Sequence, residues 1–510
     1  MTLARARAVA LLGVAGHLVE VEADIATGLP AFTLVGLPDT SLAEARDRVR
    51  AAAANTGCPL PARRITVNLS PAGLPKAGTA FDLAVAVALL AAAEQIPQQP
   101  VAACMHYGEL GLDGRVRGVR GVLPAVAAAV RAGYPRVVVP AEAALEASLV
   151  PGADVVPVRS LAEVVALHRG ELVPDSVPVA LPDHQDRLGG VDLSDVVGQD
   201  EGRHALEVAA AGGHHLLLVG PPGAGKTLLA NRLPGLLPDL DDREALEVTA
   251  VHSVAGTLDP AVGLLRRPPI ESPHHTSTVP AMVGGGAGLP RPGAASRAHR
   301  GVLLLDEAAE FAPAVLDALR QPLESGELLI QRAHGMARLP ARFQLVLTSN
   351  PCPCGRASGK GLDCTCTPTA RRRYFNRLSG PLLDRVDLQV EVGPVSRAQM
   401  AAGELPESSV VVGDRVQRAR AAARARLVGS PWTCNGELPG AWLRTTGRLP
   451  VSRTRLLDRA LDAGQISARG YDRILRTAWT LADLAGRGRP ETGDVAEALA
   501  LRLRGQVTVR

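Results

Sequence analysis

The sequence predicts a multidomain α/β protein that ends in an all-α domain. In the first part of the chain, apolar segments with the two-residue period of strands alternate with segments of helical period. Two later apolar runs, 216–219 and 302–305, are typical of buried strands of a parallel sheet. Beyond residue 413 only helical periodicity remains. A chain of 510 residues can hold two to four domains, and we expect a first domain at 1–168, a linker at 169–190, a core at 191–394 and a helical domain at 395–510.

The first domain is expected to be mixed α/β. The patterns predict strands at Leu18–Ala23, Phe32–Val35, Arg64–Leu69 and Arg136–Val139, helices at Ser41–Ala54, Asp82–Ala93, Leu123–Ala132 and Ser160–Leu167, and a hairpin across 105–116. The apolar run Ala8–Val14 is too short for a signal peptide, and no run reaches the roughly 18 residues of a membrane helix. We therefore expect a cytoplasmic protein with reduced thiols and no membrane partner.

The end of the chain is basic and helical. The stretch Leu172–Leu188 is rich in Pro and Asp and lacks periodicity, as a linker does, and a further boundary is expected near Pro394–Glu407. Helices are predicted at Gly413–Leu427, Ser452–Ala463, Ala468–Ala485 and Thr492–Leu503. Residues 411–510 hold 18 Arg against 9 acidic residues, a charge of +9 that leaves −5 for the rest. Such a segment suits an anionic partner such as nucleic acid, although a solvated helical surface explains the charge equally well.

A phosphate-binding loop lies at the centre of the chain. An apolar strand enters the complete pattern GxxxxGK[ST], and a helix follows. Glycines allow the tight turn that points backbone N–H groups at phosphate oxygens, and the helix N-terminus adds its dipole. The Lys reaches the β- and γ-phosphates and the Thr hydroxyl serves Mg²⁺. The predicted nucleotide-binding residues are Gly220, Pro221, Pro222, Gly223, Ala224, Gly225, Lys226 and Thr227.

Polar residues end two further apolar strands. Asp306 and Glu307 follow the strand 302–305, where Asp306 would hold Mg²⁺ and Glu307 would polarise the attacking water. Asn350 ends the strand 345–349, and in ring ATPases such a residue lies between the carboxylate strand and the phosphate loop and helps to place the water. A solvated acidic pair and a turn-forming Asn are the alternatives. Together with the phosphate loop, these residues predict binding and hydrolysis of ATP with Mg²⁺.

Two arginines follow the nucleotide motifs at positions from which they could contact a nucleotide. Arg385 could reach the γ-phosphate of a neighbouring subunit, as an arginine finger acting in trans does. Arg469 opens a helix of the C-terminal domain and could contact the nucleotide of its own subunit. Taken alone, each is better explained as a surface residue, and it is their order and spacing after the two nucleotide motifs that favour the functional roles.

Four cysteines form two CxC pairs within fifteen residues, at Cys352, Cys354, Cys364 and Cys366. Four thiolates in one short segment fit a tetrahedral structural zinc site, and an inert or redox-active loop is the alternative. Zinc there could fix the position of Arg385 or form a DNA-facing knob. Cys58, Cys104 and Cys434 are isolated and are expected to be small buried apolar residues.

These motifs together resemble the AAA+ superfamily, and specifically the clade of magnesium-chelatase and minichromosome-maintenance motors. The resemblance implies an AAA+ core at 191–394 with the C-terminal helices as its lid. Two insertions are typical of the clade, the first containing Ser272–Thr276 and Val283–Gly286 and the second a hairpin across Leu328–Arg342. In such motors these insertions line the central pore of a ring. His274 and His275 are therefore expected in a pore loop rather than in a metal site.

The chain further resembles the YifB/ComM family along nearly its whole length. The resemblance is carried by VGLPD at 35–39, NLSPAGLPKAG at 68–78, GELGLDG at 108–114, SPHH at 272–275, LRQPLE at 319–324, NPCPCG at 350–355 and SGPLLDRVD at 379–387. It implies a homohexameric ATP-driven DNA translocase or helicase that promotes branch migration in homologous recombination, in natural transformation or DNA repair, with recombination proteins as partners. Arg332 and Arg338 are candidate phosphate contacts, or hairpin surface charges. Glu271 stands where an Arg is expected.

The first domain resembles the proteolytic domain of Lon proteases, with the catalytic pair replaced. Ala80 takes the position of the nucleophilic Ser, and the partner Lys would fall near Leu123. Neither residue can perform nucleophilic catalysis, so we expect no peptidase activity. ATP-dependent casein degradation that Lys76→Ala abolished would contradict this. Lys76 and Asp82 are expected in ordinary surface and helix-capping roles.

Other functions stay open at this point. A magnesium-chelatase-type motor subunit, which remodels a metal-insertion complex, has the same core. The Lon-like domain and the four cysteines argue against it. An ATP-dependent protease is disfavoured by Ala80 and Leu123, and a non-enzymatic nucleotide-gated scaffold by the intact Lys226 and Glu307.

Overall fold

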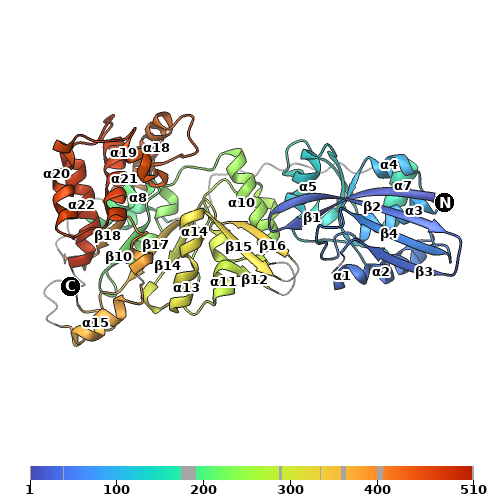
Figure 1. Ribbon diagram of the computed structural model, residues 1–510, viewed down its shortest axis with the longest axis horizontal. Coiled ribbons are helices and arrows are strands. Elements are labelled where there is room, and N and C mark those ends of the chain that lie inside the picture. Colours follow the sequence, from blue (N-terminus) through green and yellow to red (C-terminus); the bar gives the residue numbers. More distant parts are fainter. Residues whose placement is uncertain are drawn as a thin grey trace.

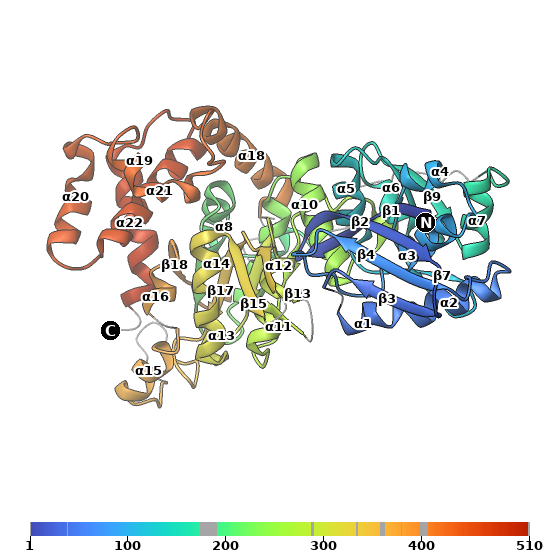
Figure 2. The same cartoon turned by 45° about the vertical axis from the view of Figure 1, so that its right-hand side comes forward.

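The computed structural model describes residues 2–37, 39–173, 191–286, 290–332, 335–357, 363–378, 380–397, 399 and 406–507. The N-terminal domain lies at one end of an elongated molecule, the C-terminal helices lie at the other, and a parallel sheet lies between them (Figures 1 and 2). Most of the expected linker, residues 174–190, lies outside the described residues, as do residues 400–405 of the expected last boundary.

The N-terminal domain is a seven-stranded mixed sheet with the order β3-β4-β2-β1-β5-β8-β9. Its strands are β1 (Thr2–Leu12), β2 (Ala15–Ala26), β3 (Ala31–Val35), β4 (Arg64–Ser70), β5 (Met105–His106), β8 (Arg136–Pro140) and β9 (Asp154–Val158), with a small hairpin of β6 (Glu109–Leu110) and β7 (Val116–Arg117). Its helices are α1 (Thr40–Ala43), α2 (Ala45–Asn55), α3 (Asp82–Ala92), α4 (Gln98–Ala102), α5 (Val122–Arg131), α6 (Ala144–Ser148) and α7 (Leu161–Arg169).

Several details of this domain differ from the sequence-based predictions, and β9, α4 and α6 were not predicted. The predicted helix Ser41–Ala54 is divided into α1 and α2. The predicted hairpin across 105–116 is divided too, since β5 joins the large sheet and only β6 and β7 pair with each other. Residues 8–12 of the apolar run Ala8–Val14 belong to a long strand, β1, which pairs antiparallel with β2 over its whole length. Alternate alanines of β1 are buried, so its inward face is made of small residues.

The apolar helix α3 is buried along its whole length, as expected for a core helix. Among the described residues, no helix is both long and apolar enough to cross a membrane.

The core domain contains a five-stranded parallel sheet with the order β11-β14-β17-β10-β18. The strands are β11 (Ile270–Glu271), β14 (Val302–Leu305), β17 (Gln344–Ser349), β10 (Leu216–Val219) and β18 (Leu388–Glu391). Both faces of β10 and β14 are buried, which explains why these two strands are uninterrupted apolar runs. Alternate residues enter two different clusters: Leu216 and Leu218 pack toward the C-terminal helices, and Leu217 and Val219 pack toward the insertions.

The helices of the core surround this sheet and carry the insertions. They are α8 (Asp200–Gly212), α9 (Lys226–Ala230), α10 (Asp242–Ala255), α11 (Val279–Val283), α12 (Ala294–Arg297), α13 (Pro313–Ala318), α14 (Arg320–Ser325), α15 (Pro368–Phe375) and α16 (Gly380–Leu383). The expected second insertion hairpin is formed by β15 (Glu327–Arg332) and β16 (Gly335–Pro340). In the first insertion, β12 (Gly284–Gly285) pairs with β13 (Arg291–Pro292).

The C-terminal region is helical, as predicted. It comprises α18 (Ser409–Arg426), α19 (Gly440–Arg444), α20 (Val451–Asp462), α21 (Ala468–Leu484) and α22 (Thr492–Val507). Ile474, Ala478 and Trp479 of α21 belong to the same buried cluster as Leu216 and Leu218 of the sheet. The helices therefore share a hydrophobic core with one face of the sheet.

The N-terminal domain contacts the core domain at two places. Leu246 and Ala250 of α10 pack on the apolar cluster that contains α5. The turn between β1 and β2 reaches the insertion hairpin: a Cβ on Gly13, whose φ is +66°, would lie 2.5 Å from the carbonyl oxygen of Arg338. A side chain would not fit there, so a glycine allows the two backbones to approach.

Candidate nucleotide-binding site

The phosphate loop leaves the carboxyl end of β10 and enters α9 at Lys226. Its first glycine is required by a close approach, because a Cβ on Gly220 would lie 2.0 Å from the carbonyl oxygen of Val392. Gly223 and Gly225 both have positive φ, 78° and 87°. The local structure thus fits the tight, N–H-lined turn that cradles phosphates.

Lys226 is buried, and its ammonium group is hydrogen-bonded within the loop. Nζ donates to the carbonyl oxygens of Gly220 at 2.8 Å and Pro221 at 2.9 Å, and to Oδ1 of Asn350 at 3.2 Å. Burial lowers the pKa of Lys226, while Asp306 and Glu307 act in the opposite direction. The strand order places β17, which Asn350 follows, between β14 and β10. The structure therefore brings Asn350 to the phosphate loop, as the sequence predicted.

The two carboxylates lie at the same edge of the sheet. Oδ1 of Asp306 accepts a hydrogen bond from the Thr227 hydroxyl at 2.9 Å and another from Thr348. The Glu307 amide donates to the Thr348 hydroxyl at 3.0 Å, and Glu307 has a left-handed backbone with φ of 52°. Hydroxyl and carboxylate oxygens are the ligands that Mg²⁺ prefers, so Thr227 and Asp306 are suited to hold it beside a bound nucleotide.

Three contacts at this site were missed by the sequence analysis. Thr348 bridges Asp306 and Glu307, as described above. His275 of the first insertion lies with Nδ1 3.7 Å from a carboxylate oxygen of Glu307, so the expected pore-loop residue contacts the nucleotide site. The Gln199 amide donates to the carbonyl oxygens of Ala224 and Gly393, which ties the residue before α8 to the loop. Thr348 and Gln199 belong to none of the motifs found in the sequence, and His275, which ends SPHH, was expected only in a pore loop.

The two candidate arginines are placed differently. Arg385 precedes β18 and lies at the amino end of the sheet, away from its own phosphate loop at the carboxyl end. Its side chain is 9% exposed and forms an ion pair with Glu324. Arg469 is exposed in the first turn of α21.

The candidate DNA contacts belong to the insertion hairpin. Arg338 of β16 is 64% exposed and lies 3.4 Å from the Glu327 carboxylate. Arg332 ends β15, and its side chain lies outside the described part of the chain. Glu271, the departure noted in the first insertion, is paired with Arg297 by two hydrogen bonds of 2.8 and 2.9 Å.

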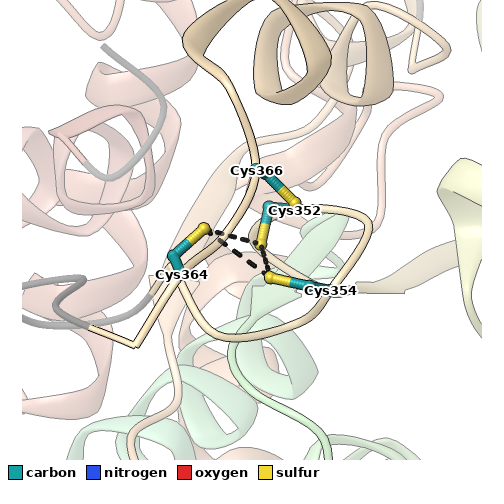
Figure 3. A group of neighbouring side chains, drawn as sticks. All are labelled: Cys352, Cys354, Cys364 and Cys366. Carbon is teal, nitrogen blue, oxygen red and sulfur yellow. Dashed lines mark hydrogen bonds between the residues drawn. The ribbon is translucent and has the colours of Figure 1, made fainter.

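The four cysteines of the two CxC pairs converge on one point (Figure 3). Their sulfur atoms all lie within 4.8 Å of one another, and three of the sulfur pairs are 3.3 to 3.6 Å apart. Tetrahedral zinc with Zn–S bonds of about 2.3 Å places its sulfurs about 3.8 Å apart. Both the donor set and its spacing therefore fit a tetrahedral metal site.

This cluster rests against the phosphate loop. Cys352 follows Asn350 by two residues, and the turn after it brings Gly355 onto Pro222. A Cβ on Gly355, whose φ is +75°, would lie 2.5 Å from Cδ of Pro222. The cysteine loop is thus joined to the candidate nucleotide site through Asn350 and also packs on its phosphate loop through Gly355.

In the N-terminal domain, the positions expected for a catalytic pair lie together in an apolar cluster. Leu123 is a buried member of the cluster and Ala80 packs against it. The expectation of surface roles for Lys76 and Asp82 is wrong. Lys76 is 1% exposed and donates to the carbonyl oxygens of Leu69 and Pro71, and Asp82 is fully buried and pairs with Arg48 at 2.7 Å. The charge of Asp82 is thus paired with Arg48, and the ammonium group of Lys76 is hydrogen-bonded to backbone carbonyl groups.

Comparisons with known proteins agree with this geometry. Residues 192–400 match the family described as magnesium chelatase, subunit ChlI, residues 21–143 match subunit ChlI of Mg-chelatase, and residues 406–502 match the ChlI C-terminal family. An uncharacterised protein of Mycobacterium tuberculosis is 51% identical over 99% of both chains. The competence protein ComM of Haemophilus influenzae is 40% identical over 98% of both chains, and the uncharacterised YifB of Escherichia coli is 42% identical over 93% of this chain and 92% of its own.

The fold, the site and these matches define a magnesium-chelatase-like AAA+ ATPase. Within that class, the chain belongs to the YifB/ComM family.

Proposed function

We propose that the chain is an ATP-driven DNA translocase that acts as a hexamer and promotes branch migration in homologous recombination. The observation that carries the proposal is the convergence of Lys226, Asp306 and Asn350 at the carboxyl end of the sheet, on a core whose insertion hairpin also carries the exposed Arg338. The full-length similarity to a protein named for competence supports DNA as the substrate.

For hydrolysis, ATP would bind with its β- and γ-phosphates on Lys226, which must exchange its bonds to the loop carbonyls for phosphate oxygens. Thr227 and Asp306 would hold Mg²⁺, which would neutralise charge on the phosphates. Glu307 would polarise the attacking water, and Asn350 would orient it. Because His275 lies beside Glu307, the first insertion is positioned to respond to the state of this carboxylate.

The strand β17 would couple ATP hydrolysis to movement of the DNA-binding hairpin. The hairpin β15–β16 precedes this strand, and Asn350 follows it, so a shift at the nucleotide has a short path to Arg338. Exposed guanidinium groups bind phosphates without regard to sequence, as a translocase requires.

The proposed hexamer is a ring in which one subunit contributes Arg385 to the nucleotide site of its neighbour. Arg385 lies at the opposite end of the sheet from its own phosphate loop, so it could act only on the nucleotide of a neighbouring subunit. It would first have to release Glu324. Arg469 would contact the nucleotide from its own lid helix. Zinc on the four cysteines would fix the cysteine loop against the phosphate loop. The protein would work in the cytoplasm, with recombination proteins as its partners.

A comparison of arginine variants tests the DNA-binding part. Arg338→Ala should weaken binding of single-stranded and branched DNA uniformly across sequences and reduce the slope of log K against log salt by about 1. Arg46→Ala is the matched control and should bind as the wild type does, because Arg46 is an exposed arginine of α2 that pairs with Asp47 as Arg338 pairs with Glu327. Equal DNA binding by the two variants would remove the hairpin from the proposal.

A magnesium-chelatase-type motor subunit, which remodels a metal-insertion complex, is the second candidate. It is favoured by the chelatase families that match all three parts of the chain. An ATPase rate that no DNA changes would favour it over the translocase.

A further inference from the structure

A cavity lies at the amino end of the parallel strands, at the opposite end of the sheet from the phosphate loop. It has a volume of about 640 Å³. The residues just before β10 and β17, His215 and Phe343, form its floor, and the C-terminal region closes it with α18, α21 and the segment 431–437. Since the phosphate loop leaves the carboxyl end of β10, this cavity is separate from the ATP site.

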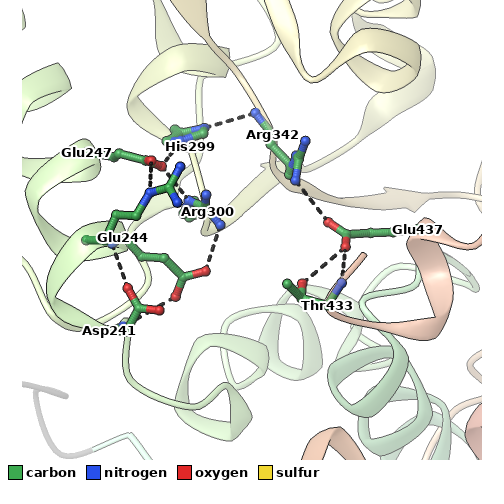
Figure 4. Close-up of polar contacts among 9 residues, drawn as sticks. Asp241, Glu244, Glu247, His299, Arg300, Arg342, Thr433 and Glu437 are labelled. Atoms are coloured by element: carbon green, nitrogen blue, oxygen red, sulfur yellow. Dashed lines mark hydrogen bonds and ion pairs between the residues drawn. The ribbon is translucent and has the colours of Figure 1, made fainter. Parts of the chain in front are cut away.

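The carboxylates that line the cavity are already neutralised. Each is paired with an arginine: Asp239 with Arg267 at 3.1 Å, Glu244 with Arg300 at 2.7 Å, Glu437 with Arg342 at 3.3 Å, and Glu324 with Arg385. Figure 4 shows two of these pairs, in which Arg300 lies among carboxylates of α10 and Arg342 reaches across to Glu437. The lining acids therefore leave no charge to balance further cations.

Three further arginines of the lining have no carboxylate partner among the residues that the structure describes. They are Arg420 and Arg424 of α18 and Arg476 of α21. Nε of Arg420 donates to the carbonyl oxygen of Ala210 at 2.8 Å, and Nε of Arg476 is buried without any hydrogen-bond partner. Burial lowers the pKa of both Arg420 and Arg476, although nearby carboxylates, Glu437 for Arg420 and Asp387 for Arg476, act in the opposite direction. Buried guanidinium groups without a directly paired carboxylate are costly, and an anion with several acceptor oxygens would relieve that cost.

The same lining contains an aromatic ring. Trp432 is half-buried in the segment 431–437 and packs partly against the core shared by the sheet and the C-terminal helices. Indole rings are stacking platforms for nucleobases, and arginines beside them bind the phosphates. The volume of the cavity is in the range of small-ligand sites.

We propose that this cavity is a second nucleotide site, in which Arg420, Arg424 and Arg476 bind the phosphate of a nucleoside phosphate and Trp432 stacks on its base. The ligand is either a free nucleotide or a terminal nucleotide of a DNA strand. The proposal does not depend on the motor function above, because it concerns binding at a site without the hydrolytic residues.

Binding measured in a Lys226→Ala background, which disables the phosphate loop, tests the proposal. The probes are deoxythymidine 5′-monophosphate, a 5′-phosphorylated thymidine tetranucleotide and inorganic phosphate, each titrated calorimetrically. Arg424→Gln and Arg476→Gln should each lower affinity for the nucleotide probes roughly 10-fold or more, since each removes a charge-assisted bond. Arg418→Gln, exposed on the same helix α18, is the control and should bind like its parent.

The outcomes separate the sources of the ligand. Binding of the mononucleotide identifies a free nucleotide, and binding of the tetranucleotide alone identifies a strand end. Trp432→Leu should weaken both nucleotides and leave phosphate unchanged. The proposal is overturned if no probe binds the Lys226→Ala protein, or if Arg424→Gln and Arg476→Gln bind as the parent does. Equal affinity for phosphate and mononucleotide would overturn the stacking role of Trp432.

Discussion

The contact between Gly355 and Pro222 predicts that one methyl group in the cysteine loop will damage ATP hydrolysis. In Gly355→Ala the new Cβ would lie 2.5 Å from Cδ and 2.7 Å from Cγ of Pro222. Carbon atoms in contact stay about 3.5–4.0 Å apart, so Pro222 must move by about 1 Å. Pro222 is part of the phosphate loop, and a misplacement of that size costs about 100-fold in rate, or about 2.7 kcal/mol.

The assay is steady-state ATPase activity, with thermal unfolding measured in parallel. Gly355 also has a positive φ of 75°, which an Ala adopts at a cost of about 1–2 kcal/mol. Gly486→Ala is the matched control, because Gly486 has a φ of 69° and nothing within 4 Å of its Cβ position. We expect the control to lose stability and keep its activity. The reasoning is refuted if Gly355→Ala keeps its kcat/KM within about threefold of wild type, or if the control loses as much activity.

Three further predictions follow from the site and the core. Cys364→Ser should reduce the bound zinc measured by elemental analysis and lower ATPase activity, whereas wild-type protein without zinc would contradict the metal site. Glu307→Gln should bind ATP with near-normal affinity and lose about 100-fold or more in hydrolysis; normal turnover would remove Glu307 from catalysis. Burial lowers the pKa of His214 and of His215 to about 4. Because the unfolded chain takes up a proton at each histidine near pH 6.5 and the folded protein does so only near pH 4, the free energy of unfolding is highest above about pH 6.5. It falls by up to about 3 kcal/mol for each histidine as the pH falls toward 4. Urea unfolding at several pH values tests this, and a midpoint unchanged between neutral pH and pH 5 would contradict it.

The placement of the candidate nucleotide-site residues could be predicted because the chemistry of such a site requires particular residues at fixed spacing. The phosphate loop, the carboxylates after β14 and the Asn after β17 are each local patterns, and parallel strands bring their carboxyl ends together. The parallel strands themselves were evident as apolar runs because both faces of the sheet are buried.

What the sequence did not predict depends on contacts between distant segments. His275 reaches Glu307 across 32 positions of the chain, and no periodicity encodes that distance. The strand β1 was missed because its buried face consists of alanines, which carry no strand preference. Lys76 looked like a surface residue, since only the three-dimensional structure shows the carbonyl groups that accept its hydrogen bonds.

The structure of the cysteine loop was predictable only in part. Two CxC pairs predicted a shared site, and the sulfur positions agree with it. The packing of Gly355 on Pro222 was not predictable, because it joins residues that are far apart in the sequence and depends on the order of the strands.

The central claim, that ATP hydrolysis drives movement on DNA, is tested most directly by branch migration of a synthetic four-way DNA junction. Wild-type protein with ATP and Mg²⁺ should convert the junction to duplex products, and Lys226→Ala should not. No conversion by the wild type, together with an ATPase rate that DNA does not change, would contradict the claim.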